Sequence, residues 1–293
     1  MVVGIFLSVI AATIRMTIPI ILPAFGGLIS ERSGVINVGL EALVAGGAFG
    51  GALFSVMTGN PYIGILGSII FGVVIAAFFS LFTVKFSGDQ IIVGLGFNFL
   101  IAGLLPFLSA RIFGYRGSSP SIQGIGSLSV GSFEFTMFDP LIIILPLLAY
   151  VFLYKTNLGY KVRAVGREPF VADVSGIRVF RLKYLCVILG GVLAALGGAY
   201  LALSVSNRYV MGISAGRGFV AIAAIRLGDW KPRKIMGASL FFAFLYALQI
   251  AFQGSWLPTE LFLMAPYLGV IAVLGGVVGS ISPPSKFEPY IRD

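Results

Sequence analysis

The chain lacks histidine and has a single cysteine, Cys186, among its 293 residues. Without a second cysteine it has no intrachain disulfide. Without histidine it has no Cys/His zinc site, no haem-binding histidine and no Ser-His-Asp triad, so we expect neither a metal site nor a catalytic residue. Charge is scarce too, because 11% of the residues are charged while 58% are hydrophobic. Soluble domains have about 25% charged residues, so this composition indicates an integral membrane protein.

Long hydrophobic runs without strand-like alternation favour membrane-spanning helices over a barrel. Apolar windows between Gly, Pro and charged breaks predict spans near 5–28, 38–57, 62–84, 90–110, 139–154, 184–206, 216–227, 233–252 and 264–281. The range 216–227 is too short to cross as a straight helix, so we expect it to be tilted, re-entrant or buried. Small residues at 45–55 and 190–202 predict tight helix contacts. The predicted fold class is an all-α integral membrane protein, a polytopic bundle of about 8–10 transmembrane helices in one domain over residues 1–293.

Basic residues predict which ends face the cytoplasm. The loop at 155–183 holds seven lysines and arginines, and if it is cytoplasmic, alternation places fifteen of the chain's twenty basic residues inside. Four fall outside, and Arg15 lies near the start of the first span. Positive charge collects in cytoplasmic loops, so we expect a plasma-membrane protein with the N-terminus outside and the C-terminus inside. The basic excess then faces membrane lipid, and nucleic-acid binding is not needed to explain it.

Two long loops carry the polar sequence between spans. The loop at 111–138 falls outside and is rich in glycine and serine, so it is either a flexible linker or an external cap over a pathway. The cytoplasmic stretch RAVGREPFVADVSGI, at 163–177, predicts a short helix outside the bilayer, with Pro169 in its first turn and Gly176 as its stop. That helix is a candidate docking element for a soluble partner, and the alternative is a solvated loop that serves only the positive-inside rule.

Three stretches resemble, in order and spacing, permease subunits of the ATP-binding-cassette (ABC) importers for branched-chain amino acids, simple sugars and nucleosides. RAVGREPFVADVSGI resembles their cytoplasmic coupling segment, although Glu168 stands where the family often has Asn. PIILPAFGGLISERSGVINVGLEALVAGGAFGGAL, at 19–53, and GRGFVAIAAIRLGDWKPRKIMGASLFFA, at 216–243, resemble signatures of the nucleoside (basic-membrane-protein-dependent) branch. The resemblance assigns ATPase coupling to Arg163, Ala164, Val165, Gly166, Arg167, Glu168, Pro169, Ala172 and Gly176, and motif roles to Glu31, Arg32, Gly34, Gly216, Arg217 and Gly218.

The resemblance implies a permease without ATPase activity that translocates nucleosides into the cytoplasm, with simple sugars as the alternative substrate. ATP and Mg²⁺ would be bound, and the ATP hydrolysed, by partner cassettes. The other implied partners are a second permease, either a paralogue or a copy, and an extracytoplasmic substrate-binding lipoprotein. No Walker A pattern of the form GxxxxGK[ST] occurs in the chain, in agreement with ATP being bound elsewhere. Closure of the cassettes would move the coupling helix and shift the permease between outward-facing and inward-facing states.

Polar residues inside the spans are the candidates for a substrate pathway. Asn37 and Glu41 are four apart, so on a helix they share one face, where they either contact substrate or lock the bundle by hydrogen bonds. Glu31 and Arg32 precede that helix and more readily form an ion pair or a cap. The remaining pathway candidates are amides, which suit neutral polyhydroxylated or base-containing ligands: Asn98, Gln249 and Gln253. Few carboxylates or arginines lie in the spans, which disfavours branched-chain amino acids as substrates.

Two other classes compete with an ABC permease. An ion-coupled secondary carrier could use Glu41 as its ion site, although no inverted repeat with matched broken helices is evident. An intramembrane enzyme is disfavoured by the lack of histidine, of paired intramembrane aspartates and of a metal cluster.

Overall fold

The computed structural model of the chain describes residues 2–130, 133–251, 264, 266–272, 275, 283, 287 and 290. A short antiparallel hairpin is formed by β1 (Leu128–Val130) and β2 (Phe133–Phe135). Helices α3 and α8 continue as π-helical turns at Leu81–Lys85 and Leu201–Val205. The helices are α1 (Val2–Arg32), α2 (Leu40–Thr58), α3 (Pro61–Ser80), α4 (Gln90–Phe113), α5 (Leu141–Lys155), α6 (Asn157–Arg167), α7 (Pro169–Val174), α8 (Val179–Tyr200), α9 (Arg217–Leu227) and α10 (Pro232–Ala251).

Within the described residues, six helices are long and apolar enough to cross a membrane, namely α1, α2, α3, α4, α8 and α10. Helices α5 and α6, bent by 76° at their junction, make a seventh if they count as one span. The predicted all-α membrane bundle is confirmed, but its count of about 8–10 spans is not reached in the described part of the chain. Helix α9 has 11 residues, so the span predicted at 216–227 is too short to cross. Half of the span predicted at 264–281 lies outside the described residues, and the described residues 264, 266–272 and 275 are helical.

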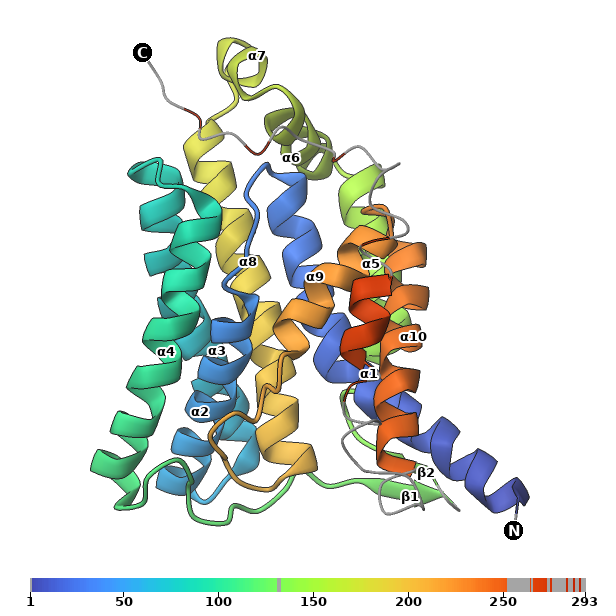
Figure 1. Cartoon of the computed structure of the whole chain (residues 1–293). Coiled ribbons are helices and arrows are strands. Elements are labelled where there is room, and N and C mark those ends of the chain that lie inside the picture. The colour runs from blue at the N-terminus through green and yellow to red at the C-terminus, as the bar shows by residue number, and fades with distance from the viewer. Residues whose placement is uncertain are drawn as a thin grey trace.

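Figure 1 shows α6 and α7 at one end of the bundle and the hairpin at the other. The chain leaves α1 near the α6 end, runs through the non-helical residues 33–39, and enters α2 part-way down the bundle. Helix α9 also begins inside the bundle and rises toward the α6 end (Figure 1). Two helix starts and one stretch of irregular backbone therefore lie in the interior, where hydrocarbon cannot satisfy backbone polar groups and protein must do so.

Small residues let the central helices approach closely, as the sequence predicts for 45–55 and 190–202. A Cβ at Gly26 would overlap the backbone of Gly190 where α1 crosses α8. A Cβ at Gly198 would overlap Val44 where α8 crosses α2. Because lipid provides no hydrophobic effect between helices, such close packing is what holds them together. Helices α1, α2 and α8 form the centre of the bundle, around which the candidate site is built.

The hairpin end is closed by backbone pairing between two loops. The Ser119 N–H donates to the Tyr209 carbonyl (3.0 Å), and the Tyr209 N–H donates to the Ser119 hydroxyl (2.9 Å). The Ile122 N–H donates to the Asn207 carbonyl (2.9 Å). Burial raises the pKa of Tyr209 to about 12. Hydrogen bonds thus hold residues 119–122 of the loop at 111–138, which does not fit a flexible linker. The other interpretation of this loop, an external cap over a pathway, stays a prediction.

Candidate coupling and gating site

The stretch between α1 and α2 forms a turn that serine side chains stabilise by hydrogen bonds. Gly34 has a φ of +86°, which residues with a side chain rarely adopt. The buried Ser30 hydroxyl donates to the Val35 carbonyl (2.8 Å), and the Ser33 hydroxyl donates to the Ser30 carbonyl (2.7 Å). Because α2 begins only at Leu40, the prediction that Asn37 and Glu41 share one helix face is wrong. The glycine and serines of this segment favour a turn over a continuous helix.

Glu41 joins α2 to the start of α9. Its Oε1 accepts the Gly216 N–H (2.9 Å) and its Oε2 accepts the Gly218 N–H (2.8 Å). A carboxylate at a helix N-terminus pairs with free N–H groups and with the positive end of the helix dipole. Gly218 is needed for this fit, since a Cβ there would overlap the Glu41 backbone. Both carboxylate oxygens are thus used within the protein, which matches the bundle-locking interpretation and not a direct substrate contact.

Arg217 lies beside this cap, in the first turn of α9. Its guanidinium donates to the Ile213 carbonyl (3.1 Å) and lies over the Tyr246 ring, 5.1 Å from the ring centre. The Tyr246 hydroxyl donates to the Ala215 carbonyl (3.3 Å). Arg217 therefore ties the α9 start to α10 inside the bundle.

Amides of α4 satisfy the irregular backbone between α1 and α2. The Asn98 amide accepts the Ala42 N–H (3.0 Å) and donates to the Val38 carbonyl (3.0 Å). The Gln90 side-chain oxygen accepts the Ile36 N–H (2.6 Å). Asn98, a predicted pathway residue, thus holds α4 against α2. Sequence reasoning missed Gln90, although an amide at the first position of an apolar span was a usable signal.

Asn37 is the polar residue of this stretch whose side chain stays unused. It is 1% exposed, and neither its amide oxygen nor its nitrogen has a hydrogen-bond partner among the described residues. It lies close to Gly39, itself packed against the Phe79 ring. A buried amide without partners costs about 1–3 kcal/mol, so Asn37 stays the pathway candidate with free hydrogen-bonding capacity. Gln249 is half-buried on α10, and Gln253 lies outside the described residues.

A second cluster lies where α1 ends. The buried Glu31 carboxylate accepts the Trp230 indole N–H (2.5 Å), and the Arg226 guanidinium is 4.0 Å away. Arg32 donates to the Trp230 carbonyl (2.7 Å) and to the Tyr154 hydroxyl (3.1 Å). Glu31 therefore pairs with Arg226, and the expected ion pair between Glu31 and Arg32 is not found among the described residues, where Arg32 contacts Trp230 and Tyr154 instead. Trp230, which links α1 to the loop after α9, was not predicted as a site residue.

That loop turns sharply before α10. Asp229 and Trp230 have φ values of +52° and +51°, in the left-handed region. Lys231 donates to the Asp229 carboxylate (2.7 Å), and this hydrogen bond lowers the pKa of Asp229, with a further contribution from Lys234. The turn places the Trp230 indole N–H within hydrogen-bonding distance of the Glu31 carboxylate.

The segment predicted as one coupling helix is two helices. Pro169 begins α7, and Gly176, with a φ of +82°, follows its end, both as predicted. Residues 163–167, however, form the last turn of α6, and the Glu168 N–H closes that helix on the Ala164 carbonyl (2.9 Å). The helix breaks at Glu168 because proline at 169 has no N–H and restricts the residue before it.

The end of α6 lies directly on the turn after α1. A Cβ at Gly166 would overlap the Arg32 carbonyl, and a Cβ at Gly34 would lie 3.3 Å from Gly166 Cα. The Arg163 guanidinium lies over the Tyr154 ring, 4.8 Å from its centre. Val165 and Ala172 are buried in a small apolar cluster with Val179 of α8. Arg167, Glu168 and Ala164 are exposed, so they lie on the outer face of this segment.

These contacts form one continuous series that connects α6 with α9. The α6 end contacts the turn at 32–34, the same stretch continues into Glu41, and Glu41 holds the start of α9. Glu31 and Arg32 connect the turn to the far end of α9 through Trp230. The end of α6 is thus connected through packed and hydrogen-bonded groups to both ends of α9.

A family model for the branched-chain amino acid transport system permease component matches residues 9–274 of the chain. The chain belongs to this permease family. Two relatives agree over nearly their full length: the guanosine ABC transporter permease protein NupQ of Bacillus subtilis is 32% identical, with 97% of this chain and 96% of the relative covered. The nucleoside ABC transporter permease protein NupC of Lactococcus lactis is 31% identical, with 97% and 96% covered.

Two further matches agree with a permease fold. The putative glucose ABC transporter permease protein TsgC13 of Haloferax volcanii is 32% identical, with 95% of this chain and 86% of the relative covered. A solved transporter described as of the metal-chelate ABC type, in an inward-facing conformation, matches with a TM-score of 0.53 at 17% identity, covering 91% of this chain and 85% of that chain. The chain is thus a multi-pass membrane permease, a transport component and not a catalytic subunit.

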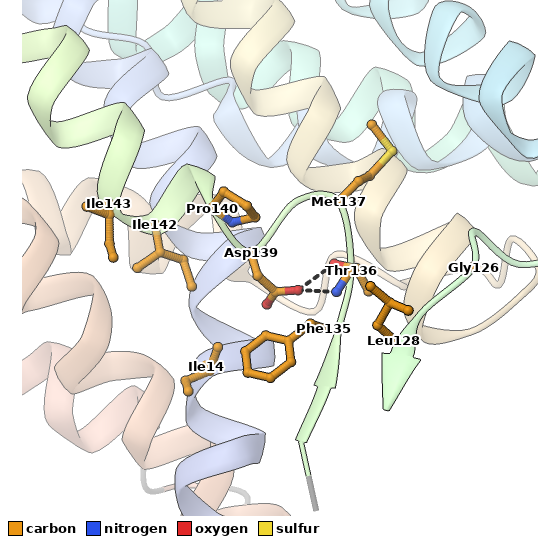
Figure 2. Close-up of a pocket in the computed structure, with 10 residues that line it drawn as sticks. All are labelled: Ile14, Gly126, Leu128, Phe135, Thr136, Met137, Asp139, Pro140, Ile142 and Ile143. Carbon is orange, nitrogen blue, oxygen red and sulfur yellow. Dashed lines mark hydrogen bonds between the residues drawn. The ribbon is translucent and has the colours of Figure 1, made fainter. Parts of the chain in front are cut away.

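The permease has an apolar cleft of about 740 Å³ at its hairpin end, between α1, the hairpin and the start of α5. Figure 2 shows Ile14 and Phe135 on one side and Ile142 near Asp139 on another. The Asp139 carboxylate is turned to Thr136, accepting its N–H and its hydroxyl (2.8 Å to the hydroxyl). Because the lining is almost wholly apolar, the cleft does not resemble a site for a polyhydroxylated solute.

Proposed function

We propose that the chain is the permease subunit of an ABC importer that moves nucleosides into the cytoplasm, driven by ATP hydrolysis in partner cassettes. The observation that carries this proposal is the seating of α6 on the turn at 32–34, in line with Glu41 and the start of α9. A cassette that moves α6 and α7 would shift the turn, and the turn would shift α9. Alternating access needs a bistable element of this kind inside the bundle.

The cassettes would dock on α7. Its side chains Phe170, Val171 and Val174 are 67%, 60% and 76% exposed, although the helix lies outside the spans. Exposed apolar side chains gathered on one short helix mark a protein contact. The basic and acidic residues beside them, Arg167 and Glu168, would form its polar rim.

The substrate class is proposed from the relatives and from the interior amides. The relatives named for guanosine and for nucleosides are each covered over 96% of their length, and a putative glucose permease, which is 32% identical and covered over 86% of its length, makes sugars the second candidate. The buried Asn37 amide has no hydrogen-bond partner among the described residues, so it can donate a hydrogen bond to a base or a ribose and accept one from it. We propose that Asn37 contacts the substrate, and that Glu41 and Asn98 hold neighbouring helices together.

The remaining partners and the orientation complete the proposal. A second permease, paralogous or identical, would form the other half of the pathway, and a lipoprotein outside would deliver substrate at the hairpin end. The excess of basic residues near α6 and α7 supports a cytoplasmic position for that end, with the N-terminus outside and the C-terminus inside.

The test is uptake by proteoliposomes that hold the permease pair, with cassettes, ATP and Mg²⁺ inside and the binding protein outside. We expect uptake of labelled guanosine that requires ATP and is competed by other nucleosides but not by glucose. Competition by glucose alone would move the assignment to sugars. Uptake by this chain alone, driven by an ion gradient without ATP, would identify a secondary carrier and overturn the proposal.

A further inference from the structure

A basic groove lies beside the coupling segment, at the α6 end of the bundle. It is lined by three cations, Lys161, Arg178 and Arg181, by Leu182 and Leu185 of α8, and by the backbone at 176–177, and it encloses about 470 Å³. The three cations are exposed. Within the described part of the chain, the three cations of the groove have no ion-pair partner.

At Leu185 the groove borders an exposed apolar strip of α8. Leu182, Leu185 and Leu189 are spaced three and four residues apart, so they share one face of the helix. Leu185 is 48% exposed and Leu189 is 41% exposed, within a helix apolar enough to span a membrane. A ligand that fills the groove and follows this strip must join an anionic group to an apolar chain.

We propose that this groove binds the headgroup of an anionic phospholipid. Its phosphate would lie among Lys161, Arg178 and Arg181, and an acyl chain would follow Leu185 and Leu189 into the hydrocarbon. A free phosphate ion satisfies the cations but leaves the leucines uncovered. The proposal rests on the cytoplasmic position given above to the α6 end, since that leaflet is rich in anionic lipid and basic pockets between helices there bind such headgroups.

The position of the groove gives the lipid a role in coupling. Gly176 and Arg178 belong to the connection that directly follows α7, and Lys161 belongs to α6. A bound headgroup would hold these segments together at the membrane surface. Anionic lipid would therefore steady the helix that we propose to contact the cassettes. The exposed side chains of α7, Phe170 and Val174, are not among the residues that line the groove, so cassette and lipid can bind together.

The test compares lipid retention in two variants of the whole transporter, purified into nanodiscs that contain phosphatidylglycerol and phosphatidylcholine. The groove variant is Lys161→Gln/Arg178→Gln/Arg181→Gln. The matched control, Lys85→Gln/Lys155→Gln/Arg233→Gln, removes the same charge from exposed positions assigned to the same membrane side. Native mass spectrometry counts each lipid on the permease. We expect the groove variant to lose its preference for phosphatidylglycerol by on the order of tenfold, and the control to keep it.

A third variant, Leu185→Ala/Leu189→Ala, distinguishes a lipid from a soluble anion. We expect it to retain less phosphatidylglycerol while its response to inorganic phosphate matches that of the parent. Displacement of the lipid by millimolar phosphate, with no effect of the leucine changes, would identify a soluble-anion site and overturn the lipid assignment.

Equal phosphatidylglycerol retention by groove variant and control would overturn the proposal outright. So would loss of cassettes from the groove variant with lipid retention unchanged, which would make the groove a protein contact. If the triple variant does not purify, Arg181→Gln alone is scored against Arg233→Gln in the same way. Because lipids are counted on the permease itself, this result does not depend on which solute the transporter carries or on whether uptake needs ATP.

Discussion

Glu41 holds the start of α9, because its two oxygens accept two N–H groups there. In Glu41→Gln one acceptor and the charge at the helix N-terminus are lost. We expect a loss of stability of about 1–2 kcal/mol, measured by thermal unfolding in detergent. Transport should slow through a lower maximal rate while the apparent KM for substrate stays unchanged, because the carboxylate holds helices and does not bind solute.

The control for Glu41→Gln is Glu134→Gln, which removes an exposed carboxylate paired with Arg15. Exposed pairs contribute about 0–1 kcal/mol, so this variant should behave as the parent. A Glu41→Gln protein with unchanged stability and a raised KM would show that Glu41 contacts substrate.

At the level of single residues, the sequence singled out polar groups that lie inside the bundle but did not show what they contact. Glu31, Asn37, Glu41 and Asn98 stand out because polar groups in lipid are costly. Their partners come from distant segments, such as Gly216 for Glu41 and Trp230 for Glu31, and spacing along the chain carries no information about such contacts. The i, i+4 argument for Asn37 and Glu41 failed because it assumed a continuous helix.

At the level of elements, α7 is the surface that we propose to meet the cassettes. Phe170→Asp/Val174→Asp places charge in the middle of that apolar patch. We expect the affinity for the cassettes to fall by more than about tenfold, as for central contacts of protein interfaces, measured by co-purification at known cassette concentration. Membrane insertion should be normal, because it depends on the spans.

The matched control for α7 is Leu128→Asp on β1, a side chain that is 77% exposed at the opposite end of the bundle. It should retain cassettes at the parental level. Equal cassette recovery by the α7 variant and this control would contradict the docking role of α7.

Elements with strong local signals were predicted well. Pro169 marks the start of α7 because proline restricts the backbone, and Gly176 marks its end because glycine can adopt a positive φ. The apolar runs of α1 to α4 located four spans to within a few residues. We did not predict the π-helical ends of α3 and α8, because they depend on packing. We also missed the break at Glu168, because Pro169 was taken as the start of one helix and its effect on the preceding residue was not considered. The short α9 could be recognised as unusual from its length, but its interior start is set by Glu41.

The whole molecule makes its clearest prediction through sidedness. In a Cys186→Ser parent, single cysteines at Ser121 or Ser129, which are exposed at the hairpin end, should react with an impermeant thiol reagent added to intact cells. A cysteine at Ser175, exposed just after α7, should react only after the cells are broken. Ser119 is unsuitable because it is 5% exposed and its hydroxyl is hydrogen-bonded. Labelling with the opposite sidedness would reverse the topology and remove the coupling assignment.

The central claim is that α6 transmits cassette movement through its contact with the turn at 32–34. A methyl group at Gly166 would overlap the Arg32 carbonyl, whereas a Cβ at Gly103 on α4 meets no atom within 4 Å. The most direct measurement is the number of substrate molecules imported per ATP hydrolysed, in proteoliposomes with enclosed cassettes, for Gly166→Ala against Gly103→Ala. We predict that Gly166→Ala binds cassettes and hydrolyses ATP but imports several-fold less substrate per ATP, while Gly103→Ala matches the parent. An equal ratio in both variants would contradict the account.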